Sequence, residues 1–193
     1  MFHPKSNFLP GKVLAELAGE FTKLKDNKSV KVIILQSEGE KAFCAGASFD
    51  ELLAIDNFDT GKEFFMGFAR VINAMRKCPQ FIIERIQGEA VGGGGGLIAA
   101  ADYALAVENA LIKLSKFALG IGPFVVGPAV ERKIGRAAYS QISIGYEWYD
   151  SEWSKGKGLF AETFATIEEL DNGVTGSVEG TIEGYSNPYF FNS

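Results

Sequence analysis

The sequence predicts an α/β fold in which helices cover a sheet of buried strands. Residues 30–36 and 81–87 are rich in apolar and β-branched side chains, as strands buried on both faces are. Each is followed by a turn of small residues and then by a stretch with helical character. This repeated order of strand, loop and helix is typical of α/β proteins.

The first third of the chain supplies a helix, a strand and a loop. Residues 11–25 place leucine and phenylalanine at helical spacing, which predicts an amphipathic helix. Residues 30–36 read VKVIILQ and predict the first buried strand. After a glycine-containing turn, residues 41–55 predict a loop that opens into a short helix.

The middle of the chain supplies the clearest helix and the second strand. Residues 61–77 predict a helix because large apolar side chains fall on one side of it, namely Phe64, Phe68, Val71, Ile72 and Met75. Residues 81–87 read FIIERIQ and predict a strand. Glu84 and Arg85 are unexpected in a run that otherwise has the composition of a buried strand.

The last part begins with five consecutive glycines that run into an apolar helix. Short strands are predicted at 103–107 and 111–114, and residues 124–145 predict one or two helices. Residues 172–193 are rich in Gly, Ser, Thr and Asn and lose helical periodicity. We therefore expect a core domain over residues 1–171 and an irregular tail over 172–193.

Composition describes a globular protein of ordinary character. The 193 residues are 47% hydrophobic and 22% charged, which suits one domain with a sizeable core. The net charge is −5, and Lys and Arg are scattered rather than gathered into a patch. This predicts no nucleic-acid partner and no anionic membrane surface. No apolar run approaches the roughly 20 residues of a membrane span.

Histidine and cysteine usage restricts the chemistry further. The single histidine, His3, is at the extreme N-terminus, which argues against a Ser-His-Asp triad and a zinc site. Cys44 and Cys78 give neither a disulfide framework nor metal-type spacing, so we expect a reduced cytoplasmic protein without a metal. The N-terminal stretch MFHPKSNFLP lacks the basic start and apolar run of a signal peptide.

Two loops are candidates for chemistry: residues 43–47 after the first strand and residues 88–94 after the second. Both are strand-to-helix turns of small residues, which expose backbone N–H groups near the positive end of a helix. Two such N–H groups aimed at one point form an oxyanion hole. Taken singly, a glycine-rich turn more often serves close packing or flexibility, so both interpretations remain open.

The two loops together resemble the enoyl-CoA hydratase/isomerase (crotonase) superfamily. The matching stretches are FCAGASFDEL and IQGEAVGGGGGLIAAADYALA, with further matches at HPKSN, VKVIILQSEG, ALGIGP, KIG and KGLFAETF. The resemblance covers residues 3–171. It implies a crotonase-like spiral of ββα units, assembled as trimers or dimers of trimers. It also implies an acyl-CoA thioester as substrate, with coenzyme A as part of that substrate and no other cofactor.

The resemblance assigns roles to individual residues of the two loops. The thioester carbonyl oxygen would lie between the backbone N–H groups of Ala47 and Gly93, which would stabilise an enolate. Lys41 would lie near the phosphates of coenzyme A, although it is equally well explained as a solvated surface lysine. The substrate-binding residues implied in this way are Lys41, Ala45, Gly46 and Gly92.

The sequence departs from the family at the positions of two catalytic glutamates. Hydratases of this family use this pair to hold and activate water. Here the two positions fall on Gly96 and Lys116. Lys116 is a proton donor or base if burial lowers its pKa, a partner for a substrate carboxylate, or a lysine that reaches solvent.

Two functions from different classes follow. The first is a crotonase-type acyl-CoA enzyme that acts as a hydratase, isomerase or related enolate chemist. The second is a non-catalytic acyl-CoA-binding or assembly subunit, which the loss of both glutamates favours. The family's N-terminal hairpin is missing, and residues 168–193 stand in place of the helices that cover the acyl pocket. A dinucleotide-binding loop is disfavoured, because Leu97 breaks the G-x-G-x-x-G spacing.

Overall fold

The computed structural model describes residues 7–114 and 122–186. The helices are α1 (Gly11–Leu24), α2 (Phe49–Leu53), α3 (Phe58–Arg76), α4 (Gly93–Ala100), α5 (Gly127–Ile144), α6 (Ser151–Gly156) and α7 (Ile167–Ser186). The strands are β1 (Val32–Gln36), β2 (Ala42–Cys44), β3 (Phe81–Ile86), β4 (Glu89–Val91), β5 (Tyr103–Val107), β6 (Ile112–Lys113) and β7 (Glu162–Phe164).

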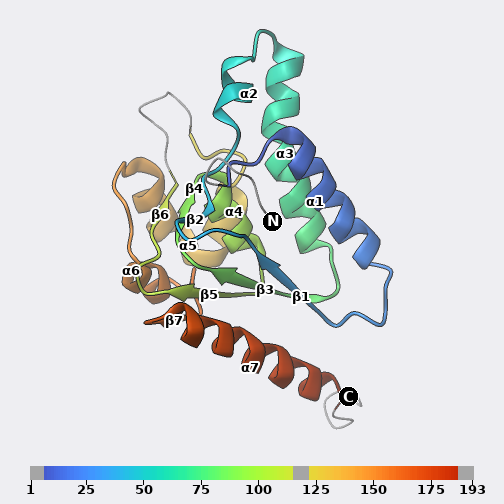
Figure 1. Ribbon diagram of the computed structural model, residues 1–193. Coiled ribbons are helices and arrows are strands. Elements are labelled where there is room, and N and C mark those ends of the chain that lie inside the picture. Colours follow the sequence, from blue (N-terminus) through green and yellow to red (C-terminus); the bar gives the residue numbers. More distant parts are fainter. Residues whose placement is uncertain (1–6, 115–121, 187–193) are drawn as a thin grey trace.

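The strands form two parallel sheets, and the chain visits them alternately. The larger sheet has the order β1-β3-β5-β7 and the smaller one the order β2-β4-β6. Each turn of the chain therefore adds one strand to each sheet before a helix returns it to the start, as Figure 1 shows. Parallel neighbours require such crossovers. This is the spiral of ββα units that the family resemblance implied.

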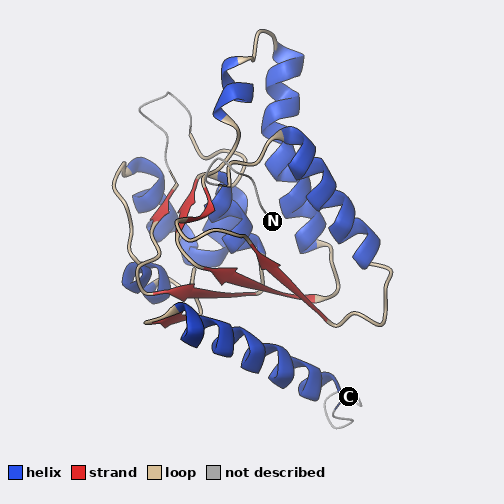
Figure 2. Cartoon of the chain, viewed as in Figure 1, coloured by secondary structure: helices blue, strands red, loops and turns tan. Residues whose placement is uncertain are grey.

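The core lies between the larger sheet and the helices that follow the smaller one. Three isoleucines of β3, at 82, 83 and 86, are buried, and α4 is buried from Gly94 to Ala100. Full burial of each large aliphatic side chain contributes about 1.5–3 kcal/mol. Helix α7 lies along the other side of the larger sheet (Figure 2). The sheet is thus covered on both faces at the central strands β3 and β5, which explains why they are apolar. The expectation of burial on both faces is wrong for β1 at the sheet edge, where Leu35 is buried but Ile34 is 44% exposed.

The tail prediction is wrong for residues 172–186, which continue helix α7. Leu170 and Val174 are buried against the sheet, and Asp171 forms an ion pair with Arg85. Gly173 lies so close to Phe164 that an added Cβ would be 2.3 Å from the ring. Tertiary packing has overridden the weak helix propensity of this glycine-rich stretch. Residues 187–193 lie outside the described part of the chain.

The helix predicted within residues 124–145 is α5, and it contains a kink. Gly135 has φ of 79° and ψ of 160°, so two helical segments meet at this residue. The sequence left open whether this stretch forms one helix or two, and α5 consists of two helical segments joined at Gly135. Helix α6 and strands β2, β4 and β7 were not predicted, because all are short and each of these strands has only three residues. The two predicted strand-to-helix loops, residues 43–47 and 88–94, therefore contain parts of β2 and β4.

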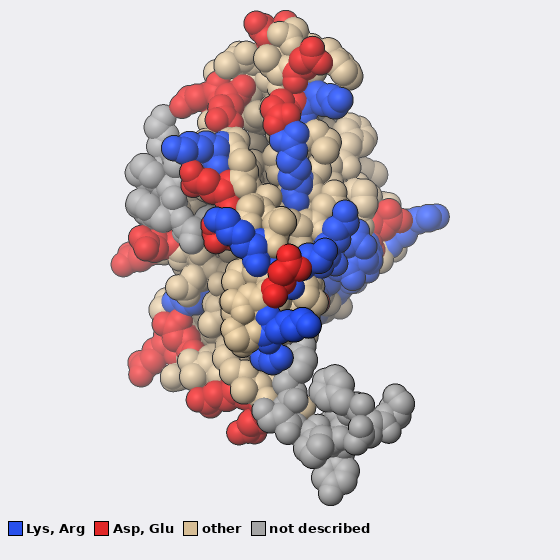
Figure 3. Space-filling model, turned by 90° about the vertical axis from the view of Figure 1, so that its right-hand side faces the viewer, with Lys and Arg blue, Asp and Glu red and all other residues tan. Residues whose placement is uncertain are grey.

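The expectation of scattered basic residues is wrong for one surface. Lys25, Lys28 and Lys31 line a single hollow beside the C-terminal end of α1. Gln80 holds this turn in place by donating hydrogen bonds to the backbone oxygens of Leu24 at 2.8 Å and Asn27 at 3.2 Å. Figure 3 shows Lys and Arg side chains gathered on this face. Among the helices in the described ranges, none combines the length and apolar character that crossing a membrane requires.

Candidate active site

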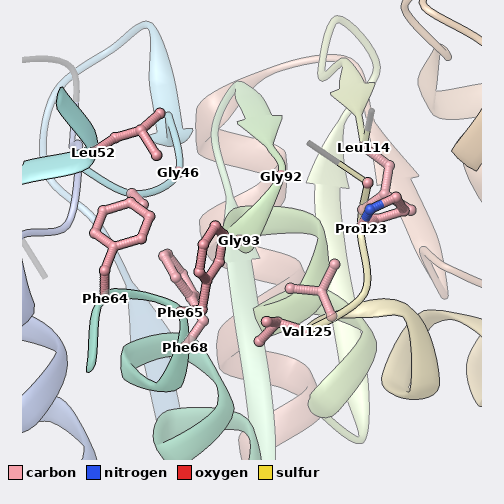
Figure 4. A pocket seen from close by; sticks show the side chains of 13 residues that line it. Gly46, Leu52, Phe64, Phe65, Phe68, Gly92, Gly93, Leu114, Pro123 and Val125 are labelled. Carbon is pink, nitrogen blue, oxygen red and sulfur yellow. The ribbon is translucent and has the colours of Figure 1, made fainter. Parts of the chain in front are cut away.

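The two loops singled out in the sequence meet at one pocket. Gly46 and Ala47, from the loop after β2, line it together with Gly92 and Gly93 at the start of α4. The pocket has a cavity volume of about 100 Å³. Figure 4 shows these glycines facing a group of apolar side chains. The structure therefore brings together both predicted oxyanion donors and two of the predicted substrate-binding residues.

Local geometry explains why glycines start α4. Gly92 has φ of 53°, a backbone conformation that residues with a side chain rarely adopt. Its N–H donates a hydrogen bond to the Lys113 backbone oxygen at 2.8 Å. An added Cβ on Gly94 would lie 2.7 Å from the Cys44 oxygen, so glycine permits close approach to β2. The first intrahelical bond runs from Gly96 N to Gly92 O. The Gly93 N–H precedes it and points out of the helix end.

The opposite loop is held by the segment before α1. Gly46 has φ of 91°, and its carbonyl accepts a 2.8 Å hydrogen bond from the Leu9 N–H. Leu9 and Ala47 also form an isolated parallel bridge. Within the described ranges, the backbone hydrogen bonds include none donated by Ala47 or Gly93. Two unpaired amides thus line one cavity, the arrangement that an oxyanion hole requires.

The walls of the pocket are apolar. Helices α2 and α3 supply Leu52, Phe64, Phe65 and Phe68, and the opposite wall is formed by Leu114, Pro123, Val125 and Val126. Phe68 is almost fully buried, and an added Cβ on Gly93 would lie 2.2 Å from its ring. Among the described lining residues there is no ionisable side chain and no hydroxyl.

Gly96, at the position of the first missing glutamate, has no space for a side chain. An added Cβ would lie 2.5 Å from Val126 Cγ1 and 3.1 Å from Ile72 Cδ1. Val126 therefore fills the space that a side chain at position 96 would need. Lys116, at the second position, lies outside the described residues, and its role stays a prediction.

The structure places Lys41 and Ala45 in an adjoining hollow rather than in the apolar pocket. This hollow has a volume of about 500 Å³ and is also lined by Gln87, Glu40 and Glu89. Ala45 directly precedes Gly46, so the hollow begins next to the pocket. Gln87 is buried, and its side-chain oxygen has no hydrogen-bond partner among the described residues.

Sequence reasoning missed the residues that shape the pocket. Phe64 and Phe68 were recognised only as the apolar side of a helix, and Val126 was not singled out. No sequence signal separates an aromatic side chain in a core from one that lines a pocket. In the parts of the chain that are described, His, Cys, Asp and Glu do not cluster in groups of three that could hold a metal ion.

A pair of alanine substitutions tests how the glycines position α4. Gly94→Ala is expected to destabilise the fold by about 1–3 kcal/mol, because the new methyl group meets the Cys44 backbone. Gly95→Ala makes only ordinary contacts, with Leu114 Cδ1 at 3.4 Å and Ile112 Cγ2 at 3.9 Å, and is expected to stabilise by about 0.5–1 kcal/mol through helix propensity. Urea unfolding of both variants measures this, and equal stabilities would contradict the close packing described here.

Comparison with known proteins identifies the family. The family model described as "Enoyl-CoA hydratase/isomerase" matches residues 1–176. The chain belongs to this family. Its sheets and spiral are those of the crotonase fold, shared with an enoyl-CoA hydratase structure from Mycobacterium smegmatis at a TM-score of 0.86. That structure is 28% identical, and the match covers 91% of this chain and 67% of the other.

Two relatives illustrate the range of chemistry within this crotonase family. An ethylmalonyl-CoA decarboxylase from Gallus gallus is 29% identical over 174 residues, which is 90% of this chain and 56% of the relative. A mitochondrial methylglutaconyl-CoA hydratase from Rattus norvegicus is 31% identical over 166 residues, 86% of this chain and 52% of the relative. The chain thus spans little more than half the length of either relative.

Proposed function

We propose that this protein acts on acyl-CoA thioesters and stabilises a thioester enolate between the N–H groups of Ala47 and Gly93. The observation that carries this proposal is that both amides line one apolar pocket and neither is paired with a described residue. Reaction at the carbon next to a thioester carbonyl places negative charge on the carbonyl oxygen. Each donor to that oxygen is worth about 3 kcal/mol in the transition state.

The proposed reactions are of the enoyl-CoA hydratase or isomerase type. Hydration needs a group that activates water and a group that protonates carbon. The described lining of the pocket supplies neither, because its side chains are all apolar. Lys116 is the proposed proton donor or base, in keeping with its position in the sequence.

Decarboxylation of a 2-carboxyacyl-CoA is a second candidate. The bond between the α-carbon and the carboxylate breaks, its electron pair forms the enolate, CO₂ leaves, and a proton from water adds to the α-carbon. These reaction steps need the two amides to stabilise the enolate and need no protein side chain as a base. An apolar lining favours it because it removes water from the substrate carboxylate, and a similar chicken protein is named as a decarboxylase.

Mass spectrometry of an acyl-CoA panel in ¹⁸O-labelled water tests the proposal. The panel contains enoyl-CoA, 3-enoyl-CoA and 2-carboxyacyl-CoA thioesters. A labelled hydroxyacyl product indicates hydration, a shifted double bond indicates isomerisation, and loss of CO₂ indicates decarboxylation. An unchanged panel contradicts catalysis. Saturable binding in that case supports the non-catalytic acyl-CoA-binding subunit, and no binding contradicts both functions.

Restoring hydratase chemistry requires more than restoring the two glutamates. Gly96→Glu with Lys116→Glu is expected to leave hydration of a short enoyl-CoA unchanged, because Val126 occupies the space beside residue 96. Adding Val126→Gly removes both Val126 atoms that the new Cβ would meet, Cγ1 at 2.5 Å and Cβ at 2.7 Å. We expect the triple variant to hydrate at least about 10²-fold faster than the natural chain, the lower end of the 10²–10⁴-fold range of acid–base catalysis. A folded triple variant with an unchanged rate contradicts this explanation.

A further inference from the structure

We infer that Phe64 limits the length of the acyl group, because its side chain separates the pocket from a second cavity. This inference rests on the proposed acyl-CoA function. Phe64 lines both the pocket, of about 100 Å³, and a groove of about 390 Å³ beside α1 and α3. No other residue is shared by the two linings among the described residues. The ring is therefore the partition between a small cavity and a larger one.

The second cavity, called the α1–α3 groove below, exists because small residues line much of it. Its lining residues are Gly11, Ala15, Glu51, Ala54, Ile55, Thr60, Glu63, Phe64, Gly67 and Arg70. Helices α1 and α3 pack so closely at Gly67 that an added Cβ would lie 2.8 Å from Leu14 Cδ1. Beside this contact, glycine and alanine leave the groove open.

The polar side chains of the α1–α3 groove already have partners. Glu51 accepts hydrogen bonds from the Gly11 N–H at 2.9 and 3.2 Å, and Glu63 is paired with Arg70. The Thr60 hydroxyl donates to a backbone oxygen at the start of α3, at 3.0 Å. Since none of these groups lacks a partner, a ligand gains little there from polar groups. The remaining lining is apolar or glycine, so the groove suits a hydrocarbon chain.

The position of Phe64 explains how it ends the pocket. Figure 4 shows its ring beside Leu52 at one side of the pocket, and Phe65 meets it edge-on with ring centres 5.1 Å apart. Phe65 lines the pocket but not the groove. A longer acyl chain that extends from the pocket toward α3 meets the Phe64 ring before it reaches the groove. With the ring in place, the pocket admits short acyl groups only.

Isothermal titration with butanoyl-, octanoyl- and dodecanoyl-CoA tests this limit. Each methylene that enters an apolar cavity raises affinity about fourfold. For the natural chain we expect affinity to change less than about fourfold from butanoyl- to dodecanoyl-CoA. Phe64→Ala joins the two cavities, and we expect it to raise the preference for dodecanoyl-CoA over butanoyl-CoA by at least about tenfold. Binding measures this preference without requiring turnover.

Three further variants serve as controls. Ala15 is exposed and lines only the groove, so Ala15→Trp fills the groove from α1 without touching the pocket. In the double variant Phe64→Ala with Ala15→Trp, the preference for the long chain is expected to return to that of the natural chain. Phe65→Ala removes an equally large ring from the pocket alone, and it is expected to leave the preference unchanged.

The outcomes separate this inference from the proposed function. Butanoyl-CoA binding with an unchanged chain-length preference in folded Phe64→Ala overturns the inference but leaves the acyl-CoA function standing. If the double variant keeps the increased preference for dodecanoyl-CoA, the inference is also overturned, because the acyl chain then extends somewhere other than the α1–α3 groove. The absence of binding by the natural chain to any of the three thioesters contradicts the proposed function itself.

Discussion

Replacing Ala47 with proline is expected to lower kcat/KM about 10²–10³-fold on whichever acyl-CoA the protein turns over. Proline has no N–H, so the substitution removes one of the two donors proposed to hold the carbonyl oxygen. Among the described residues the Ala47 N–H has no acceptor, and the substitution therefore costs no hydrogen bond in the free protein. The preceding residue, Gly46, has the conformational freedom to precede a proline. Steady-state kinetics measures the effect.

A matched variant separates the lost donor from a disturbed loop. Ala47→Ser retains the N–H and changes the side chain only, so we expect its kcat/KM to stay within a few-fold of that of the natural chain. Thermal unfolding of both variants shows whether the bridge between Leu9 and residue 47 survives. A folded Ala47→Pro protein that keeps full activity would contradict the oxyanion role of this amide. Equal losses in both variants would point to the loop instead.

The fold was largely predictable because its strands and major helices are locally consistent. Strand β5 matches the predicted residues 103–107, since a short apolar run bounded by turns has few alternatives. Helix α7 was missed because its stability comes from Leu170 and Val174 packing on the sheet, which no local pattern reveals. Tertiary contacts decide glycine-rich segments of this kind.

The sequence predicted which backbone segments line the candidate site, but not which side chains form the walls of its pocket. The resemblance of the two loops predicted Ala47 and Gly93 as donors, and both residues line the pocket, while their role as donors stays a prediction. Val126 fills the space beside Gly96 from thirty residues further along the chain, and this is a property of packing in three dimensions. The sequence alone shows that residue 96 is a glycine, whereas the lack of space for a side chain there is visible only in the structure.

Glu84, which looked out of place in the predicted strand, is buried in the core. Its side chain is fully inaccessible, and neither carboxyl oxygen has a hydrogen-bond partner among the described residues. Its neighbour Arg85 points to the opposite face and pairs with Asp171, as alternation along a strand requires. The positive charge that acts on Glu84 is that of Lys133, whose Nζ donates to the backbone oxygens of Ala101 and Asp102. Burial, opposed by Lys133, raises the pKa of the Glu84 carboxyl well above its usual 4.5.

The raised pKa predicts that Glu84 makes the protein less stable as pH rises. The folded state holds a proton that the unfolded state releases above pH 4.5, so stability is fully present below that pH. It then falls by about 1.4 kcal/mol per pH unit until the raised pKa is reached. Glu84→Gln is neutral and similar in size, so its unfolding free energy is expected to match that of the natural chain at pH 4.5. By pH 8 it is expected to exceed the natural value.

Urea unfolding of the natural chain, Glu84→Gln and Glu84→Leu across pH 4.5–8 measures this dependence. Lys133 is present in all three proteins, so the differences between them report residue 84 together with its attraction to Lys133. Glu84→Leu also removes the unpartnered polar group, and it is expected to add about 1–3 kcal/mol at every pH. Parallel curves for the natural chain and Glu84→Gln would show that the carboxyl titrates alike in the folded and unfolded states. A divergence that grows with pH identifies Glu84 as a buried carboxylic acid that the fold keeps protonated.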